Sequence, residues 1–167
     1  MHDIVLDTHV LSDFLAQYFE QWKEKKHFNV SLVEPTKFLR MPVVREMQKI
    51  IRMYDDQGVH RIVASTVAFL EIARKFQEIA ENRFQLEQFS GFIDQPPEWF
   101  VVAPVDDSLF LPLLQIPAYV TMPDGQSKAI EWIDAIHLAT ALSREKCLFA
   151  TMDSRLKRLP DFQDNII

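Results

Sequence analysis

The stretch "WIDAIHLATALSREKCLFAT" (residues 132–151) decides the fold class, because it joins a buried helix to a buried strand. Almost all side chains of residues 132–142 are apolar or small, which is typical of a helix that is buried all round. We expect this helix to run to about residue 145. The run "CLFAT" (147–151) follows as a short, continuously apolar strand. Such strands are typical of a parallel sheet that is covered on both faces.

The rest of the chain repeats this alternation of short apolar strands with helices. We expect strands over 3–7, 61–65 and 99–105, and helices over 8–26, 42–57, 66–81, 83–93 and 153–159. Thr8 and Ser65 precede or begin two of these helices and are predicted to cap them. A parallel sheet with helices on both faces has this order of elements. The pattern therefore predicts an α/β fold, a three-layer α/β/α sandwich with a mainly parallel central sheet, in a single domain over residues 1–167.

The segment between the first and second predicted strands is longer than a single connecting helix requires. Irregular sequence is followed by a strongly amphipathic helix at 42–57, so we expect an extended helical insertion at about 28–60. The polar face of that helix carries a basic stripe of Arg45, Lys49 and Arg52. The stripe is either a solvated face or a contact surface for RNA or a protein partner.

The region before the buried helix is the least regular in pattern. Residues 106–117 look helical but contain Pro112 and Pro117, which interrupt helices. The sequence "PDGQS" (123–127) is predicted to form a turn.

Composition limits the classes of function. The chain has 167 residues, a net charge of −6 from 18 basic and 24 acidic residues, and three widely separated glycines. Glycine-rich nucleotide loops, the esterase motif G-x-S-x-G and the zinc motif H-E-x-x-H are therefore absent. The negative charge is unlike that of proteins that coat nucleic acid, but it is compatible with a nuclease whose site is itself acidic. With one cysteine, no signal-peptide pattern and no apolar run of roughly 18 residues, we expect a cytoplasmic protein with no membrane association.

Four acids fall among apolar residues near the ends of the predicted strands. Asp7 ends the first strand, Glu71 lies in the second turn of the helix after the second strand, Asp134 is on the buried helix, and Asp153 follows the last strand. Ligands of parallel sheets bind at the carboxyl ends of the strands. Four carboxylates brought together repel unless a cation lies between them, and oxygen-only ligands suit Mg²⁺ or Mn²⁺. We therefore expect that a divalent metal, and not a protein base, is the partner of Asp134.

The motifs around these acids, "IVLDTHVLSDFL", "ASTVAFLEIA", "IDAIHLATAL" and "LFATMDSRL", resemble in this order those of the PIN domain family, and most closely those of VapC-type toxin ribonucleases. The resemblance implies that Asp7, Glu71, Asp134 and Asp153 are the catalytic and metal-binding acids of a Mg²⁺- or Mn²⁺-dependent endoribonuclease. It also implies products with 5′-phosphate and 3′-hydroxyl ends, and a homodimer held by an antitoxin protein. His9 stands where asparagine is common in the family, and the segment between the first two motifs is longer than in a compact VapC-type protein.

Several neighbours of the four acids are candidates for supporting roles. Thr8 and Thr151 flank site acids, where a hydroxyl group orients a carboxylate or a bound water. His137 is either a core histidine with satisfied hydrogen bonds or a catalytic group, and Glu131 is a candidate outer carboxylate. Basic side chains after the last acid are candidates for contacts to substrate phosphates: Arg155, Lys157 and Arg158.

Each of the four acids also has a structural alternative. Asp7 is an alternative cap for the helix that follows it, and Glu71 is alternatively a solvated helix residue. Asp134 is alternatively paired with His137 inside the protein. Asp153 alternatively caps the last helix, and it can do this and bind a metal.

The leading functional hypothesis is a metal-dependent endoribonuclease, the toxin of a toxin–antitoxin pair, with RNA as substrate. A haloacid-dehalogenase-type phosphatase needs an aspartate two positions after Asp7, where the chain has His9. The non-enzymatic alternative is a catalytically inactive PIN-like module that binds RNA or protein.

Overall fold

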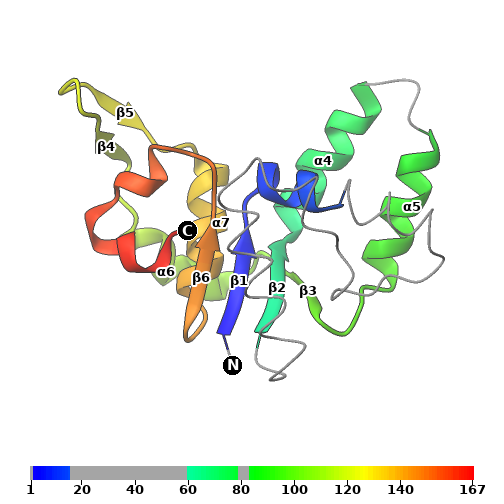
Figure 1. Ribbon diagram of the computed structural model, residues 1–167. Coiled ribbons are helices and arrows are strands. Elements are labelled where there is room, and N and C mark those ends of the chain that lie inside the picture. The colour runs from blue at the N-terminus through cyan, green and yellow to red at the C-terminus, as the bar shows by residue number, and fades with distance from the viewer. Residues whose placement is uncertain (1, 16–59, 79–82) are drawn as a thin grey trace, which may run out of the picture.

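The computed structural model describes residues 2–15, 60–78 and 83–167 and contains a four-stranded parallel sheet in the order β3-β2-β1-β6 (Figure 1). Strand β1 (His2–Leu6) lies between β2 (His60–Ser65) and β6 (Cys147–Ala150), and β3 (Phe100–Ala103) pairs with β2. Because all four strands are parallel, their carboxyl ends share one edge of the sheet. The chain therefore places Asp7, the first residue after β1, at this edge.

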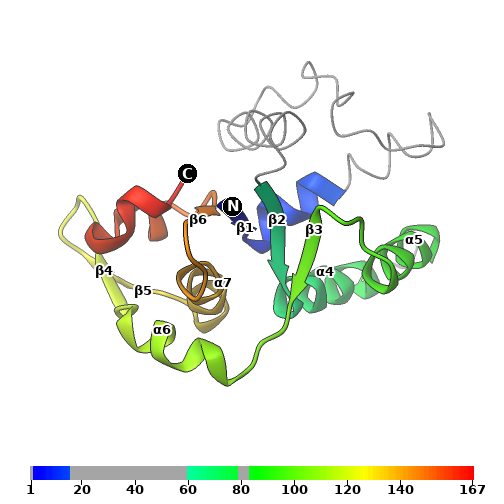
Figure 2. The ribbon, with the colours of Figure 1, turned by 90° about the horizontal axis from the view of Figure 1, so that it is seen from below.

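Helices connect and flank these strands. The elements outside the sheet are a helix over 8–15, α4 (Thr66–Glu78), α5 (Arg83–Asp94), the 3₁₀-helix η2 (Asp107–Leu109), α6 (Phe110–Gln115), the hairpin of β4 (Tyr119–Thr121) and β5 (Ser127–Ala129), α7 (Trp132–Leu142), and the 3₁₀-helices η3 (Leu156–Arg158) and η4 (Pro160–Asn165). Figure 2 shows α7 alongside β6 and β1, with α4 and α5 beside each other toward β3.

Alternate side chains of the strands fill two separate apolar cores. Ile4 and Leu6 of β1 pack into a cluster with residues of the helix 8–15, α4 and α5, whereas Val5 packs into a second cluster with Leu138 of α7 and with residues of η3 and η4. Side chains of a strand alternate between the two faces of a sheet. Both faces of the sheet are therefore covered, which explains why the strands read as continuous apolar runs.

The expected α/β class and the parallel sheet are confirmed. The four predicted strands and the helices after Ser65, at 83–93 and at 132–145 are present with boundaries that differ by a few residues. The predicted cap by Ser65 is present, because its Oγ accepts a hydrogen bond of 3.3 Å from the backbone N–H of Ala68. Helices on both faces of the sheet are compatible with a three-layer sandwich.

Three local expectations need correction or extension. A β4–β5 hairpin surrounds the predicted turn, where Gly125 has a φ of +78°. Residues 110–115 do form helix α6, because Pro112 lies in its first turn, where a missing N–H is tolerated. The predicted final helix 153–159 is wrong: only Leu156–Arg158 are helical, as 3₁₀, because Leu159 is extended before Pro160. The expected insertion up to residue 59, with its basic stripe, and the part of the predicted helix 8–26 after residue 15 lie outside the described residues, whereas His60 begins β2.

A buried ion cluster occupies the amino edge of the sheet. The side chain of Asp3 is 4% exposed, and its oxygens accept hydrogen bonds from Arg61 (3.1 and 3.2 Å) and from Arg144 (2.8 Å). Arg61 comes from β2 and Arg144 follows α7, so the cluster ties three elements together. Because it is at the opposite edge from Asp7, it has no part in the site described below.

The surface carries a few large apolar side chains. Phe110, Leu111 and Leu114 of α6 are exposed, as is Trp132 at the start of α7. Among the helices of the described residues, none is long and apolar enough to cross a membrane.

Candidate active site

Asp7 is fixed at the carboxyl edge of the sheet by three donors. Its Oδ1 accepts a hydrogen bond of 2.8 Å from the backbone N–H of Val10, so Asp7 caps the helix 8–15. Its Oδ2 accepts from the hydroxyl of Thr151 (2.5 Å) and from the N–H of Met152 (3.3 Å). The predicted cap by Thr8 is therefore wrong, whereas the expectation that the hydroxyl of Thr151 orients a site carboxylate is confirmed.

The hydroxyl of Thr8 takes part instead in a buried hydrogen-bonded chain. Thr8 Oγ1 donates to Glu71 Oε2 on α4 and lies 3.0 Å from Nε2 of His137 on α7. The other ring nitrogen of His137, Nδ1, lies 2.9 Å from Oγ of Ser65. Because the Thr8 proton is directed at Glu71, Thr8 accepts from an Nε2–H of His137. Both ring nitrogens of His137 thus have a hydrogen-bond partner.

This chain holds Glu71 in its ionised form. The interaction with His137, whose Nε2 lies 3.6 Å from Oε2 of Glu71, is the largest cause that lowers the pKa of Glu71; partial burial opposes it, and the hydrogen bond from Thr8 adds to the lowering. His137 itself is 1% exposed. Its position matches the alternative of a core histidine, and the hydroxyl of Thr8 orients a site carboxylate as expected.

Arg155 joins the other two acids. Its Nη2 lies 3.0 Å from Oδ2 of Asp134 and 2.5 Å from Oδ2 of Asp153, and its Nε lies 2.8 Å from the same oxygen of Asp153. The same guanidinium contacts the carbonyl oxygen of Ala129 at 3.2 Å and Oε1 of Glu131 at 3.6 Å. The expectation gave Asp134 a divalent metal and not a protein base as its partner, but in the structure a protein base, Arg155, forms its ion pair. The alternative partner, His137, contacts Thr8 and Ser65 instead.

The two acids respond differently to this arrangement. Burial first, and then the nearby charge of Asp153, raise the pKa of Asp134 to about 6, although Arg155 opposes the shift. Burial also acts to raise the pKa of Asp153, but hydrogen bonds from the Arg155 side chain and backbone outweigh it and hold that pKa below its usual value. Hydrogen bonding to Asp153 in turn raises the pKa of Arg155. The charge of Arg155 is thus directed mainly at Asp153, and Asp134 is incompletely compensated.

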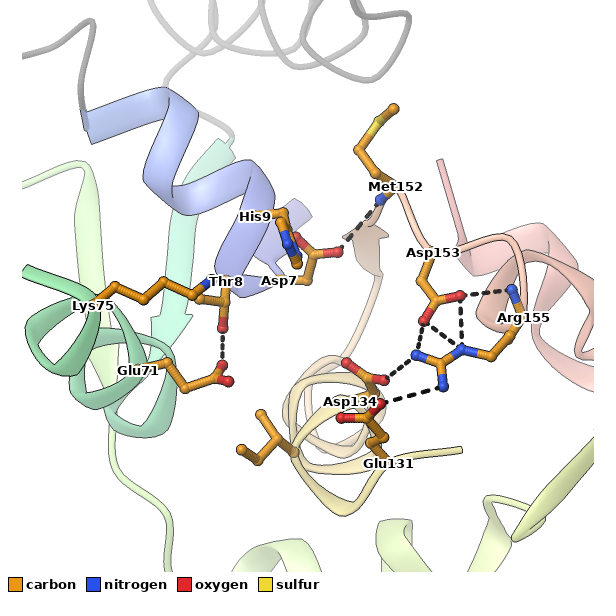
Figure 3. A pocket seen from close by; sticks show the side chains of 11 residues that line it. Asp7, Thr8, His9, Glu71, Lys75, Glu131, Asp134, Met152, Asp153 and Arg155 are labelled. Carbon is orange, nitrogen blue, oxygen red and sulfur yellow. Dashed lines mark hydrogen bonds and ion pairs between the residues drawn. The ribbon is translucent and has the colours of Figure 1, made fainter. Parts of the chain in front are cut away.

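All four acids line one cavity of about 350 Å³ (Figure 3). Glu71 and Thr8 lie on one side of it, Asp134, Asp153 and Arg155 on the other, and Asp7 between them (Figure 3). Its lining residues are Asp7, Thr8, His9, Glu71, Lys75, Glu131, Ile133, Asp134, Met152, Asp153 and Arg155. Five carboxylates and two basic side chains give the lining a formal charge of 2 − 5 = −3.

The acids share this cavity without forming a closed set of metal ligands. Among the residues that the structure describes, no group of three or more His, Cys, Asp or Glu side chains is close enough to hold a metal ion. Each carboxylate is instead drawn toward a protein donor: Asp7 to Thr151, Glu71 to Thr8, and Asp134 and Asp153 to Arg155.

Some residues that were expected to belong to the site do not line the cavity. Other residues that do line it were not predicted from the sequence. Lys157 and Arg158 are exposed and are not part of the lining. Lys75 was missed; it lies one helical turn after Glu71 on α4, and that spacing of four residues was the available signal. Ser65 was expected only as a cap, and its contact with His137 joins residues 72 positions apart.

Comparisons of the chain with family models, with curated proteins and with solved structures each found no match.

Proposed function

We propose that this chain is a PIN-like domain that acts as a divalent-metal-dependent endoribonuclease. One observation carries the proposal: Asp7, Glu71, Asp134 and Asp153, spread over most of the sequence, line one cavity at the carboxyl edge of the parallel sheet. Ligand sites of parallel α/β sheets are found at this edge. The reaction class is proposed from the four sequence motifs that resemble the family. The cavity supports it because the acids of these motifs lie together there.

The residues of the cavity fit Mg²⁺ or Mn²⁺ in kind. All four acids offer oxygen ligands, which these ions prefer. The raised pKa of Asp134, caused by burial and by Asp153, indicates crowded negative charge that a cation relieves. Asp7, Glu71, Asp134 and Asp153 are the residues that would hold the ion, after small side-chain movements away from their present donors. A bound ion supplies charge stabilisation for the phosphodiester group and activation of water for its hydrolysis.

The protein's own contribution is to orient these carboxylates and to bind the substrate. Thr151 holds Asp7, while Thr8, with His137 and Ser65 behind it, holds Glu71. Lys75 and Arg155 are the basic side chains of the cavity lining, and we expect each to contact a phosphate group of RNA.

The proposal includes the biological setting that the resemblance implies. We infer that the chain is a single PIN-like domain, a cytoplasmic toxin that works as a homodimer and is held by an antitoxin protein. The support for this setting is the order of the four sequence motifs alone.

Cleavage of RNA by the purified protein tests the function directly. We expect hydrolysis in Mg²⁺ or Mn²⁺ that EDTA abolishes and that Asp7→Asn reduces by about 10²-fold or more. Asp161→Asn, an exposed residue of η4, removes the same charge away from the cavity and should leave cleavage unchanged. RNA that stays intact with every divalent ion, or cleavage that survives in Asp7→Asn, would refute the proposal.

A second candidate function is a binding module without catalysis. One observation favours it: each of the four acids already has a protein donor, so the described residues need no metal for charge balance at Asp153. Calorimetry with Mn²⁺ separates the two candidates, because a binding module of this kind shows no uptake of the ion.

A further inference from the structure

Arg155 occupies the position that a cation between Asp134 and Asp153 would take (Figure 3). Its Nη2 contacts Oδ2 of both acids, at 3.0 and 2.5 Å. An ion of the Mg²⁺ type binds carboxylate oxygens at about 2.1 Å. The guanidinium group and such an ion cannot occupy the space beside these two oxygens together. The charged group of Arg155 is therefore a competitor for any metal that uses both acids.

When both the guanidinium of Arg155 and a divalent ion are available, the strength of their electrostatic attraction to the two acids determines which one binds. By Coulomb's law, a doubly charged ion at about 2.1 Å attracts a carboxylate about three times as strongly as a single charge at about 3 Å. The cost of removing the ion's water shell offsets part of this gain. The cavity lining remains negative with Arg155 in place, since five carboxylates face two basic side chains. A divalent ion is thus able to displace the guanidinium, at the cost of its charge-assisted hydrogen bonds.

The structure also offers the guanidinium a second location. Nη1 of Arg155 contacts the carbonyl oxygen of Ala129 at 3.2 Å and lies 3.6 Å from Oε1 of the exposed Glu131. Both partners precede the start of α7, Glu131 lines the cavity, and neither is among the four acids. A side chain released from Asp134 and Asp153 keeps these contacts. It need not be expelled into solvent, which lowers the cost of the exchange.

We propose that Arg155 is a built-in competitor of divalent metal at Asp134 and Asp153, and that metal binding moves its guanidinium toward Ala129 and Glu131. The proposal rests on the proposed function, because it assumes that the four acids take a metal. It adds a form of regulation: at low metal concentration the site is closed by the protein's own cation. The chain then acts only where the ion concentration is high enough to complete the exchange.

Calorimetric titration with Mn²⁺ tests the competition. Arg155→Gln should bind Mn²⁺ roughly tenfold or more tightly than the unaltered protein, because no charge-assisted hydrogen bonds have to be broken. Arg155→Lys, which keeps the charge but loses the planar fork, should fall between them. Lys128→Gln on β5 is the matched control, since it removes one positive charge from an exposed side chain nearby and should change the affinity by less than about twofold.

A second measurement covers the case in which Arg155→Gln does not fold. In the unaltered protein, the Nε–H resonance of Arg155, assigned with Arg155→Lys, should shift as Mg²⁺ is added and the hydrogen bonds to Asp153 break. Mn²⁺ binding that Arg155→Gln leaves equal or weaker, or an Nε–H resonance that ignores saturating Mg²⁺, would overturn the competition and leave the metal site standing. Absence of binding in both the unaltered protein and Arg155→Gln would overturn the competition and the proposed function together.

Discussion

Replacing Asp134 by asparagine should stabilise the metal-free protein at neutral pH. Burial, and next the charge of Asp153, raise the pKa of Asp134 from 3.8 to about 6. Its folded form therefore holds a proton more tightly than the unfolded chain does. Above pH 6 the carboxylate is ionised in both states, and the folded state carries the whole cost of that unfavourable charge. Asparagine keeps the shape of the side chain and removes the cost.

The size of the effect follows from the shift in pKa. A shift of 6 − 3.8 = 2.2 units corresponds to about 3 kcal/mol at about 1.4 kcal/mol per unit. The side chain is 23% exposed in an open cavity, so solvent screening reduces this to about 1–3 kcal/mol. The shift already includes the attraction of Arg155, so loss of that ion pair is counted. For a chain of this size, at about 2–4 °C per kcal/mol, the melting temperature should rise by roughly 2–12 °C.

Thermal melts in EDTA at pH 7.5 and pH 4 provide the measurement. The gain of Asp134→Asn should be complete at pH 7.5, should decrease as the pH falls from about 6 to 4, and should vanish only below about pH 3, where Asp134 is protonated in both states. Asp161→Asn removes an exposed charge and serves as the control. Other acids titrate in the same range, but the difference between the two proteins at each pH isolates Asp134. A metal-free Asp134→Asn that melts lower than the unaltered protein at pH 7.5 would refute the reasoning, because the ion pair with Arg155 would then outweigh the cost of burial.

Four further predictions concern the metal, the core and the surface. Millimolar Mn²⁺ should raise the melting temperature and EDTA should reverse the rise, because the ion binds the folded site and not the dispersed acids of the unfolded chain; a melt indifferent to Mn²⁺ counts against the site. His137→Ala should lower the free energy of unfolding by about 2–4 kcal/mol in a denaturant titration, since it leaves a cavity and removes one hydrogen-bond partner from each of the hydroxyls of Thr8 and Ser65; a loss below about 0.5 kcal/mol would contradict the buried chain. The thiol of Cys147, whose pKa burial raises to about 12, should resist alkylation at pH 8 until the protein is unfolded, as mass spectrometry can follow. Changing Arg45, Lys49 and Arg52 together to glutamine should weaken RNA or partner binding and flatten its salt dependence; binding that is unchanged at all salt concentrations would make the stripe a solvated face.

The sheet was predictable from sequence because its strands have short apolar segments, a pattern that is easily recognised. Strands β1, β2 and β6 are continuous apolar runs between helices, and burial on both faces requires such runs. The carboxyl ends of parallel strands meet at one edge, so the predicted parallel sheet places Asp7 and Asp153 at the same edge, whereas the direct pairing of β1 with β6 comes from the structure. Their common cavity follows from elements that the sequence reveals.

The hairpin of β4 and β5 was not predictable in the same way. Each strand has three residues, and nearly all of them are exposed, with Val120 the buried exception. Neither a continuous apolar run nor a clear alternation can be read from so short a segment. Only the turn at Gly125 has a local signal, and it was the part that was predicted.

The partners of the site acids were also beyond the reach of local patterns. Thr8 follows a strand and precedes a helix, so it has the composition of a cap, but its hydroxyl is taken by Glu71, 63 positions away. Arg155 and Asp134 are 21 positions apart and meet only through the tertiary fold, since Arg155 precedes η3 and Asp134 lies in the first turn of α7. Ion pairs of this kind depend on tertiary packing. Local sequence patterns therefore do not predict which residues form them.

The ion cluster of Asp3, Arg61 and Arg144 makes the two edges of the sheet energetically separable. Asp3 and Asp7 are four residues apart on an extended strand, roughly 13 Å. Substitutions at such a distance without shared partners usually have additive effects, within about 0.5 kcal/mol. Removing Arg144, which is partly exposed and would leave Asp3 its contacts with Arg61, should lower the free energy of unfolding by about 1–3 kcal/mol. Substitutions at the amino edge can therefore be used to adjust the global stability without changing the cavity. Cavity variants can then be compared at equal stability, so that a change in metal binding is distinguished from a change in the folded fraction.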